Sequence, residues 1–336
     1  MEQVTIVGLD LAKRVFQVHG ATADGGIAIR KKLSRGQVLA FFADLPPCVV
    51  AMEACATAHY WAREIGALVP PAYVKPFVKR QKNDAADAEA IAEAASRPTM
   101  RFVEPKSPQQ QARAMVFRTR DLFVRQRTQT INALRAHLAE HGLIAPQGMS
   151  NLANIRRFID EAAAEVEPLV VETAHTYLEQ IDDLSSRILK LEATLKQEAA
   201  RTDASSRMMT MPGVGPITAM AIEAFAPSLC VFRRSRDFAA WLGLVPRQHS
   251  TGGKQVLGRT SKMGHRDIRR LLIIGAMSVI RWATRKGTTP GTWLHSILLR
   301  KPRKVAAIAL ANKMARTLWA METRKEDYRD PRLTAA

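Results

Sequence analysis

Four acidic residues in the first hundred positions could together hold a metal ion: Asp10, Glu53, Asp84 and Asp87. Asp10 and Glu53 each end an apolar stretch with the pattern of a buried strand, where a charge is costly unless a cation compensates it. Asp84 and Asp87 lie three residues apart at the start of a predicted helix, so they share one face, although Asp84 alone could simply cap that helix. Hard oxygen ligands suit Mg²⁺ or Mn²⁺, and two such ions could clamp the attacking and leaving oxygens of a phosphoryl transfer.

The elements that must position these acids follow an α/β order. Apolar periodicity and the turn signal Asp24-Gly25-Gly26 predict three strands, a helix and then a βαβα succession, which is the order expected of a ribonuclease-H-like domain with a mixed sheet. The predicted strands cover 4–10, 15–21, 27–33, 48–53 and 72–74, and the predicted helices cover 36–42, 58–68 and 85–95.

The overall charge indicates the class of partner. The 336 residues include 50 Lys or Arg against 31 Asp or Glu, a formal net charge of +19, which points to a polyanion and most simply to nucleic acid. A membrane surface is the rival explanation, but the longest apolar run, at 271–280, is too short to span a bilayer. We expect no membrane partner.

The cysteines and the first residues bear on the compartment. Cys48, Cys55 and Cys230 match neither a zinc motif nor a disulfide framework, so we expect buried thiols in a reducing compartment. A strand begins almost at the first residue, so we expect no signal peptide. The predicted location is the cytoplasm.

Residues 109–141 form a long predicted helix with arginines along its polar face. Asp121 is the only acid between Arg113 and Arg135, so contact with a phosphate backbone is favoured over a merely solvated face. A second long helix begins near Pro168 and carries a heptad seam of about three repeats. That coiled-coil seam could pair within the chain or with a second protomer.

The last third, from position 204, combines glycine-rich loops with basic helices. Pro212-Gly213-Val214-Gly215 is similar to a helix-hairpin-helix turn, whose glycine amides bind a DNA phosphate. The loop Arg247-Gln-His-Ser250-Thr-Gly-Gly-Lys254 lacks the full phosphate-binding P-loop pattern. Its Ser250 could attack a phosphodiester, although on spacing alone we favour simple phosphate binding.

The basic region that contains this loop also carries three tryptophans. Between Arg247 and Lys304 there are fourteen Lys or Arg and a single acid, Asp267. For Trp241, Trp282 and Trp293, core packing is favoured over stacking on bases.

Taken together, these motifs resemble the insertion-sequence transposases of the "one-ten" family, and the loop wording is similar to its "eleven-eleven" subgroup. The resemblance covers nearly the whole chain. Its motifs are Ile-Val-Gly-Leu-Asp10-Leu-Ala-Lys, Ala51-Met-Glu53-Ala-Cys, Lys82-Asn-Asp84-Ala-Ala-Asp87-Ala, Val124-Arg-Gln-Arg-Thr-Gln-Thr-Ile-Asn-Ala-Leu-Arg135, Pro212-Gly-Val-Gly-Pro216, Ser250-Thr-Gly-Gly-Lys254, Thr260-Ser-Lys-Met-Gly264 and Val305-Ala-Ala-Ile-Ala-Leu-Ala-Asn-Lys313.

The resemblance implies a RuvC-like Asp-Glu-Asp-Asp domain that binds Mg²⁺ or Mn²⁺ through Asp10, Glu53, Asp84 and Asp87. It implies a C-terminal transposase domain whose nucleophile is Ser250, with Thr251 as the alternative because some relatives have Ser-Gly directly at this point. Strands would be exchanged through a covalent phosphoserine in a composite site across protomers. A structured non-coding bridge RNA would pair with donor and target DNA, and the protein would act as a homo-oligomer, a dimer or, in the synaptic complex, a tetramer.

We therefore predict three domains: the RuvC-like domain at 1–107, a helical and coiled-coil region for RNA contact and oligomerisation at 108–203, and a mainly α transposase domain at 204–336. Ser261 is expected to bind phosphate. The predicted nucleic-acid contacts are Lys79, Arg80, Lys82, Arg118, Arg125, Arg127, Gly213, Gly215, Arg247, Lys254, Arg259 and Lys262.

Two other functions fit parts of the pattern. A Holliday-junction resolvase or other nuclease would use the four acids with water as nucleophile. A non-catalytic nucleic-acid-binding protein would explain the charge but would leave the placed acids without a role.

Overall fold

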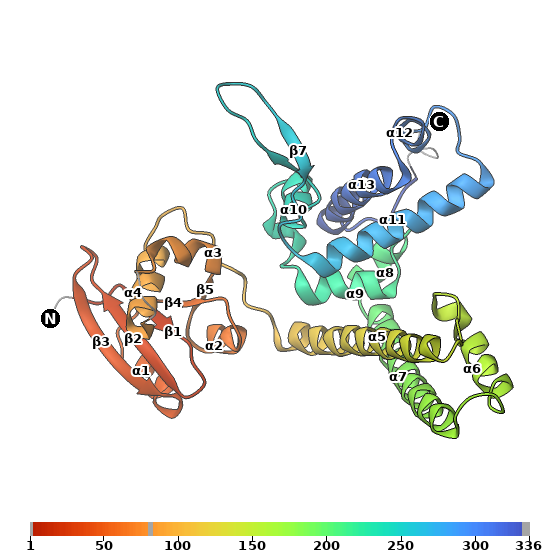
Figure 1. Ribbon diagram of the computed structural model, residues 1–336. Coiled ribbons are helices and arrows are strands. Elements are labelled where there is room, and N and C mark those ends of the chain that lie inside the picture. Colours follow the sequence, from red (N-terminus) through yellow and green to blue (C-terminus); the bar gives the residue numbers. More distant parts are fainter. Residues whose placement is uncertain (1–2, 80–82, 331–336) are drawn as a thin grey trace. The chain divides into compact units, whose positions relative to one another are not determined.

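The computed structural model describes residues 3–79 and 83–330, and the chain divides into two compact units, 1–109 and 110–336 (Figure 1). Each unit has its own core. The mixed α/β sheet predicted for the N-terminal part and the mainly helical remainder are both confirmed. Among the described residues, no helix is long and apolar enough to cross a membrane.

The first unit is built on a five-stranded mixed sheet. The strands are β1 (Ile6–Asp10), β2 (Val15–Ala21), β3 (Ile27–Ser34), β4 (Val49–Glu53) and β5 (Ala67–Val69). Their order in the sheet is β3-β2-β1-β4-β5: β2 runs antiparallel to both β1 and β3, whereas β4 is parallel to both β1 and β5. The carboxyl ends of β1 and β4 therefore lie side by side.

Helices cover both faces of this sheet. One core lies on the face covered by α1 (Val38–Ala43, after a 3₁₀ turn at Arg35–Gln37) and α2 (Ala58–Ile65), and it includes Leu9, Phe16, Met52 and Trp61. The other lies under α3 (Pro71–Val74), the 3₁₀ turn Lys75–Phe77 and α4 (Asp84–Ala95). Alternate residues of β1 and β4 point to opposite faces, so Gly8 and Asp10 look toward α4 while Val7 and Leu9 look away.

One predicted strand is wrong. The segment 72–74 belongs to helix α3, and the fifth strand is Ala67–Val69, which overlaps the end of the helix predicted over 58–68. Gly66 ends α2 and starts the extended backbone, and a Cβ there would lie 2.2 Å from the carbonyl oxygen of Val50. Pro71 then begins α3, where its fixed φ and missing N–H suit the first turn of a helix.

The second unit is helical apart from one hairpin. Its long helices are α5 (Pro108–Glu140), which begins at the division between the units, and α7 (Pro168–Ala200). The other elements are the 3₁₀ turn Met149–Asn151, α6 (Leu152–Glu161), α8 (Asp203–Met209), α9 (Pro216–Phe225), the 3₁₀ turn Leu229–Val231, α10 (Ser235–Trp241), the strands β6 (Pro246–Gln248) and β7 (Leu257–Thr260), α11 (Arg266–Lys286), α12 (Trp293–Arg300) and α13 (Arg303–Arg324).

The heptad seam of α7 is buried within the chain. Ile181 packs in a core with Ile131 and Leu134 of α5, and Leu195 packs in the core of α8–α11 and α13. This is the intrachain alternative of the two left open by the sequence. Oligomerisation through α7 stays a prediction, as does a separate domain beginning at 204.

Gly8 allows α4 to pack closely against β1. A Cβ at this position would lie 2.1 Å from the carbonyl oxygen of Ala88 and 2.6 Å from the nitrogen of Ala92. Gly8→Ala is therefore expected to push α4 off the sheet and lower the free energy of unfolding by roughly 1–3 kcal/mol. Urea-unfolding midpoints followed by circular dichroism measure this.

The matched control is Gly36→Ala, because a Cβ at Gly36 meets nothing within 4 Å. It is expected to leave the midpoint unchanged. Equal midpoints for the Gly8 and Gly36 variants would contradict the close packing of α4.

Candidate metal centre and nucleic-acid-binding residues

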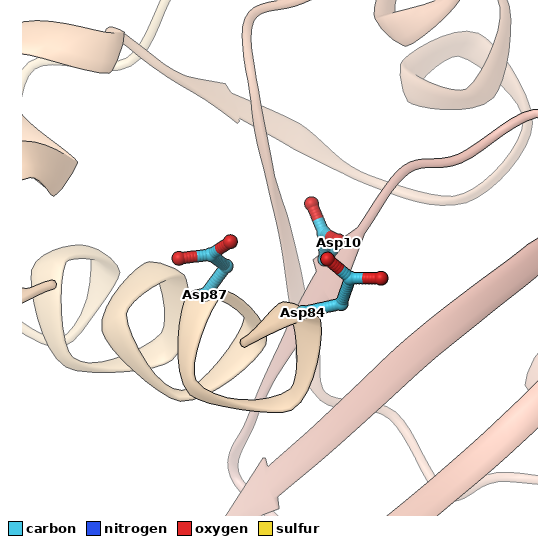
Figure 2. Close-up of side chains that lie close together, drawn as sticks. All are labelled: Asp10, Asp84 and Asp87. Atoms are coloured by element: carbon cyan, nitrogen blue, oxygen red, sulfur yellow. The ribbon is translucent and has the colours of Figure 1, made fainter. Parts of the chain in front are cut away.

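Three of the four predicted acids come together in the first unit. Asp10 ends β1, and Asp84 and Asp87 lie in the first turn of α4. Each offers one carboxylate oxygen such that the three oxygens lie within 4.8 Å of one another, and Figure 2 shows the three side chains converging. Their chemistry fits a hard divalent cation, which takes carboxylate oxygens as ligands.

Local structure explains this convergence. Asn83 caps α4, and its side chain accepts a hydrogen bond of 3.0 Å from the backbone N–H of Ala85. The start of the helix is thereby fixed opposite the end of β1. Asp10 and Asp87 are half-buried and Asp84 is exposed, so the cluster has a protein side and an open side.

Glu53 lies on the strand next to Asp10, but its carboxylate is not one of the three that come together. The parallel pairing of β1 with β4 ends at Leu9 and Met52, so Glu53 occupies the neighbouring strand at the level of Asp10. Strand alternation directs it to the same face as Asp10. Its carboxylate is not among the three that lie within 4.8 Å of one another, so its part in a four-carboxylate site stays a prediction.

The thiol of Cys55 reports the negative charge at this end of the sheet. Partial shielding of the thiol from water raises the pKa of Cys55, and the charges of Glu53 and Asp10 raise it further.

The expectation of buried cysteines is wrong. Cys48 is half-buried, while Cys55 and Cys230 are exposed, although all three are free thiols.

The lysine-rich segment before α4 is only partly described. Lys79 is exposed and forms an ion pair of 2.8 Å with Glu89 of α4. That contact holds the pKa of the Glu89 carboxyl below its ordinary value. Arg80 and Lys82 lie outside the described residues, and their predicted nucleic-acid contacts stay predictions.

The arginines of α5 divide into two groups. Arg113 pairs with Glu223 at 2.7 Å, Arg120 donates to Glu192 at 3.0 Å, and Arg127 donates to Ser185 at 3.1 Å. Their side chains thus tie α5 to α7 and α9. The reasoning that this face lacks compensating acids is wrong, because the acids come from helices that are distant in sequence.

Arg118 and Arg125 keep most of their surface exposed. Their side chains are 59% and 70% accessible, although Arg118 pairs with Asp267 at 3.0 Å and Arg125 approaches Asp121 at 3.7 Å. Three α5 arginines were predicted to bind nucleic acid. Arg118 and Arg125 are accessible to a phosphate at the surface, whereas Arg127 is half-buried against α7.

Ser250 lies on an exposed basic hairpin. The strands β6 and β7 pair antiparallel and form a hairpin (Figure 1). Residues 246–259 are all exposed. The backbone N–H of His249 donates to the carbonyl oxygen of Val256 at 2.8 Å, and Thr251 pairs with Lys254. Gly252 and Gly253 both have positive φ, which closes the turn. The hydroxyl of Ser250 is therefore accessible to a large substrate.

The basic residues predicted to bind nucleic acid around Ser250 are also accessible. Arg247, Lys254 and Arg259 lie on the hairpin, and Lys262 follows β7. Lys262 is exposed and adopts a left-handed backbone with φ 55°. Ser261 is half-buried, and its N–H donates to the carbonyl oxygen of Val245 at 2.8 Å.

The two glycines of the predicted phosphate-binding turn differ in their surroundings. Gly213 has φ 87° and packs against α11, where a Cβ would lie 2.8 Å from the carbonyl oxygen of Gly275. Gly215 is exposed at the N-cap of α9, with open space around its Cα. Gly213 thus has a packing role, and Gly215 is the residue of the turn that is open to a ligand.

The tryptophans of the basic region were expected to pack in the core, which is wrong for two of them. Trp282 is 63% exposed and Trp293 39% exposed. The nitrogen of Lys286 lies 4.5 Å from the centre of the Trp282 ring, and that of Lys313 lies 5.0 Å from the Trp293 ring. Trp241 does pack against the aromatic residues Phe232 and Phe238.

Comparison with known proteins agrees with this arrangement. The model of the IS116/IS110/IS902 transposase family matches residues 205–289, which contain Ser250. A second transposase model, for the DEDD domain of IS110 elements, matches residues 7–142, which contain the four acids. The chain belongs to the IS116/IS110/IS902 family of transposases.

Relatives of this transposase match along nearly its whole length. A "probable family 20 transposase" of Pseudomonas aeruginosa is 46% identical over 332 residues, which cover 96% of this chain and 98% of the relative. The transposase of insertion sequence IS1328 from Yersinia enterocolitica is 39% identical, covering 96% and 98% of the two chains. That of IS1111A from Coxiella burnetii is 37% identical, covering 98% and 92%.

The family membership decides between the functional classes. The protein is a transposase, an enzyme of DNA recombination, and its DEDD domain implies the use of a divalent metal ion. The non-catalytic alternative is therefore set aside.

Sequence reasoning missed the acids that organise the arginines. Asp121 of α5 accepts from Arg270 of α11 at 2.6 Å, and Asp267 of α11 pairs with Arg118 of α5. No local pattern connects residues about one hundred and fifty positions apart. The two isolated acids in basic stretches were the available signal, since a lone acid among arginines often has a structural partner.

The division of the α5 arginines predicts effects of different size for two substitutions. Arg120→Ala leaves the carboxylate of Glu192, only 23% exposed, without its cation and is expected to cost roughly 1–3 kcal/mol of unfolding free energy. Arg125→Ala removes a solvent-exposed pair and is expected to cost less than about 0.5 kcal/mol. Urea-unfolding midpoints test both variants, and a reversed order would contradict the division.

Proposed function

We propose that this transposase moves its own insertion sequence through a covalent phosphoserine formed by Ser250, with Asp10, Glu53, Asp84 and Asp87 holding Mg²⁺ or Mn²⁺. The convergence of three carboxylates within 4.8 Å carries the metal part of this proposal. When bound, the ion would supply Lewis-acid stabilisation of charge on phosphate oxygens. The exposure of Ser250 on a cationic hairpin supports its role as the nucleophile.

The proposed exchange leaves the number of phosphodiester bonds unchanged. The Oγ of Ser250 attacks the phosphorus, the new O–P bond forms as the DNA P–O bond breaks, the departing DNA oxygen takes up a proton, and the serine proton leaves to solvent. A hydroxyl of the other DNA strand then loses its proton and attacks the phosphorus of the phosphoserine. The bond to the serine oxygen breaks, that oxygen takes up a proton, and a phosphodiester is restored. No hydrolysis and no added energy source are required.

Basic residues of this chain would hold the DNA during both steps. Arg247, Lys254, Arg259 and Lys262 flank Ser250 in sequence, and with no acid between 247 and 266 they give the hairpin region a uniform positive charge. Contacts of this kind bind the backbone without reading base sequence. In this proposal the recognition of donor and target DNA is left to a structured bridge RNA.

Ser250→Ala is expected to abolish a covalent adduct between the protein and DNA, because the proposed ester forms on the Ser250 oxygen. Denaturing electrophoresis of the full chain with labelled donor and target DNA, RNA from the element and Mg²⁺ measures the adduct. Thr251→Ala is the matched control and is expected to keep it.

The same assay separates the two nucleophiles and the nuclease. An adduct that persists in Ser250→Ala but disappears in Thr251→Ala would assign the attack to Thr251. Cleavage by Ser250→Ala without any adduct would favour water as nucleophile and a resolvase-like activity of the acids.

RNA guidance predicts that exchange requires RNA from the non-coding part of the element. Purified protein with both DNAs is expected to recombine them only when that RNA is added, and altering the bases that pair with the target is expected to move the insertion site. Sequencing of the junctions measures both effects. Exchange at an unchanged site without RNA would contradict this part of the proposal.

A further inference from the structure

The second unit contains a pocket between the middle of α5 and the start of α11. Four arginines and two aspartates give it its charge. They are Arg118, Asp121 and Arg125 from α5 and Arg266, Asp267 and Arg270 from α11.

The two aspartates hold their arginines in place without neutralising the pocket. Asp267 lies 3.0 Å from Arg118 and 4.0 Å from Arg270, while Asp121 lies 2.6 Å from Arg270 and 3.7 Å from Arg125. Both aspartate side chains are only 13–14% exposed. Four guanidinium groups therefore face two carboxylates, which leaves two surplus positive charges.

Arg266 contributes one of these charges at an unfavourable place. It is the first residue of the 21-residue helix α11, where the positive end of the helix dipole disfavours a cation. Within the described part of the chain it forms no ion pair. An anion in the pocket would be attracted both by Arg266 and by the positive end of the dipole of α11.

The walls of the pocket are preformed. The ring of His265 stacks between Phe225, at 4.8 Å, and Trp241, at 6.0 Å. Gly264, with φ 106°, lets the chain pass so close to α10 that a Cβ would lie 1.9 Å from the carbonyl oxygen of Trp241. Little ordering is then needed when a ligand binds, which favours affinity.

We propose that this arginine pocket binds a phosphodiester group of a nucleic-acid backbone. Guanidinium groups match the oxygens of a phosphate, and a net positive pocket in which aspartates hold three of the four arginines suits one phosphate of a chain. The proposal rests on the proposed function in that the protein must handle nucleic acid, and it adds a defined contact away from the hairpin of Ser250.

The test uses the full chain and one double variant that keeps the shorter ion pair of each aspartate, Arg118 with Asp267 and Arg270 with Asp121. Arg266→Ala and Arg125→Ala are combined, because Arg125 is 70% exposed and Arg266 is exposed. The matched control is Arg187→Ala on α7, whose exposed side chain pairs with Asp183 at i,i+4 as Arg125 does with Asp121. Equal thermal midpoints establish that all of these variants fold.

Fluorescence anisotropy with a short labelled DNA duplex and a short labelled RNA strand measures affinity between about 50 and 200 mM salt. The double variant is expected to bind about tenfold more weakly on at least one probe, with its salt slope reduced by about one per lost phosphate contact, while Arg187→Ala binds like the wild type. Loss on one probe alone identifies DNA or RNA as the source of the phosphate.

Two outcomes would overturn the proposal and can be told apart. Wild-type binding that the double variant retains on both probes, with the same salt slope, removes the pocket and leaves the proposed function standing. Failure of the wild-type protein to bind either probe removes the nucleic-acid function and the pocket together.

Discussion

Mutual repulsion among three carboxylates, each with an oxygen within 4.8 Å of the other two, is the constraint on the acid cluster of the first unit. The fold holds them there because Gly8 lets α4 lie against β1 and Asn83 fixes where α4 begins. The positive end of α4 offsets part of the repulsion. A divalent cation would offset more, so a packing feature at one glycine and a helix cap together prepare a metal site.

The second unit instead carries an excess of positive charge. Acids of α7, α9 and α11 form ion pairs with several arginines of α5, and these ion pairs connect the long helices. Other cations lie on the hairpin of Ser250 and in the arginine pocket. A protein with a net charge of +19 can thus form ordered cores while keeping cationic surface for a polyanion.

The strands, the start of α4 and the acids were predictable because they depend on local patterns, such as apolar alternation and the spacing of Asp84 and Asp87. The fifth strand was missed because it has only three residues, which is too short to show the alternation of a strand, and two prolines follow it directly. The ion pairs of α5 and the exposure of Trp282 depend on which helices meet, and periodicity along one helix does not contain that information. The sequence also does not show that the Glu53 carboxylate lies outside the group of three carboxylates, because this depends on the direction of a side chain at a strand end.

The central claim, that this acid cluster holds a divalent ion, is tested most directly by calorimetric titration of Mn²⁺ into the full chain. Wild type is compared with Asp84→Asn and Asp87→Asn, and with Glu93→Gln, an exposed acid of the same helix paired with Arg97. The account predicts binding by wild type and by the Glu93 variant, and at least about tenfold weaker binding by the two aspartate variants. Equal Mn²⁺ affinity in all four proteins would contradict it.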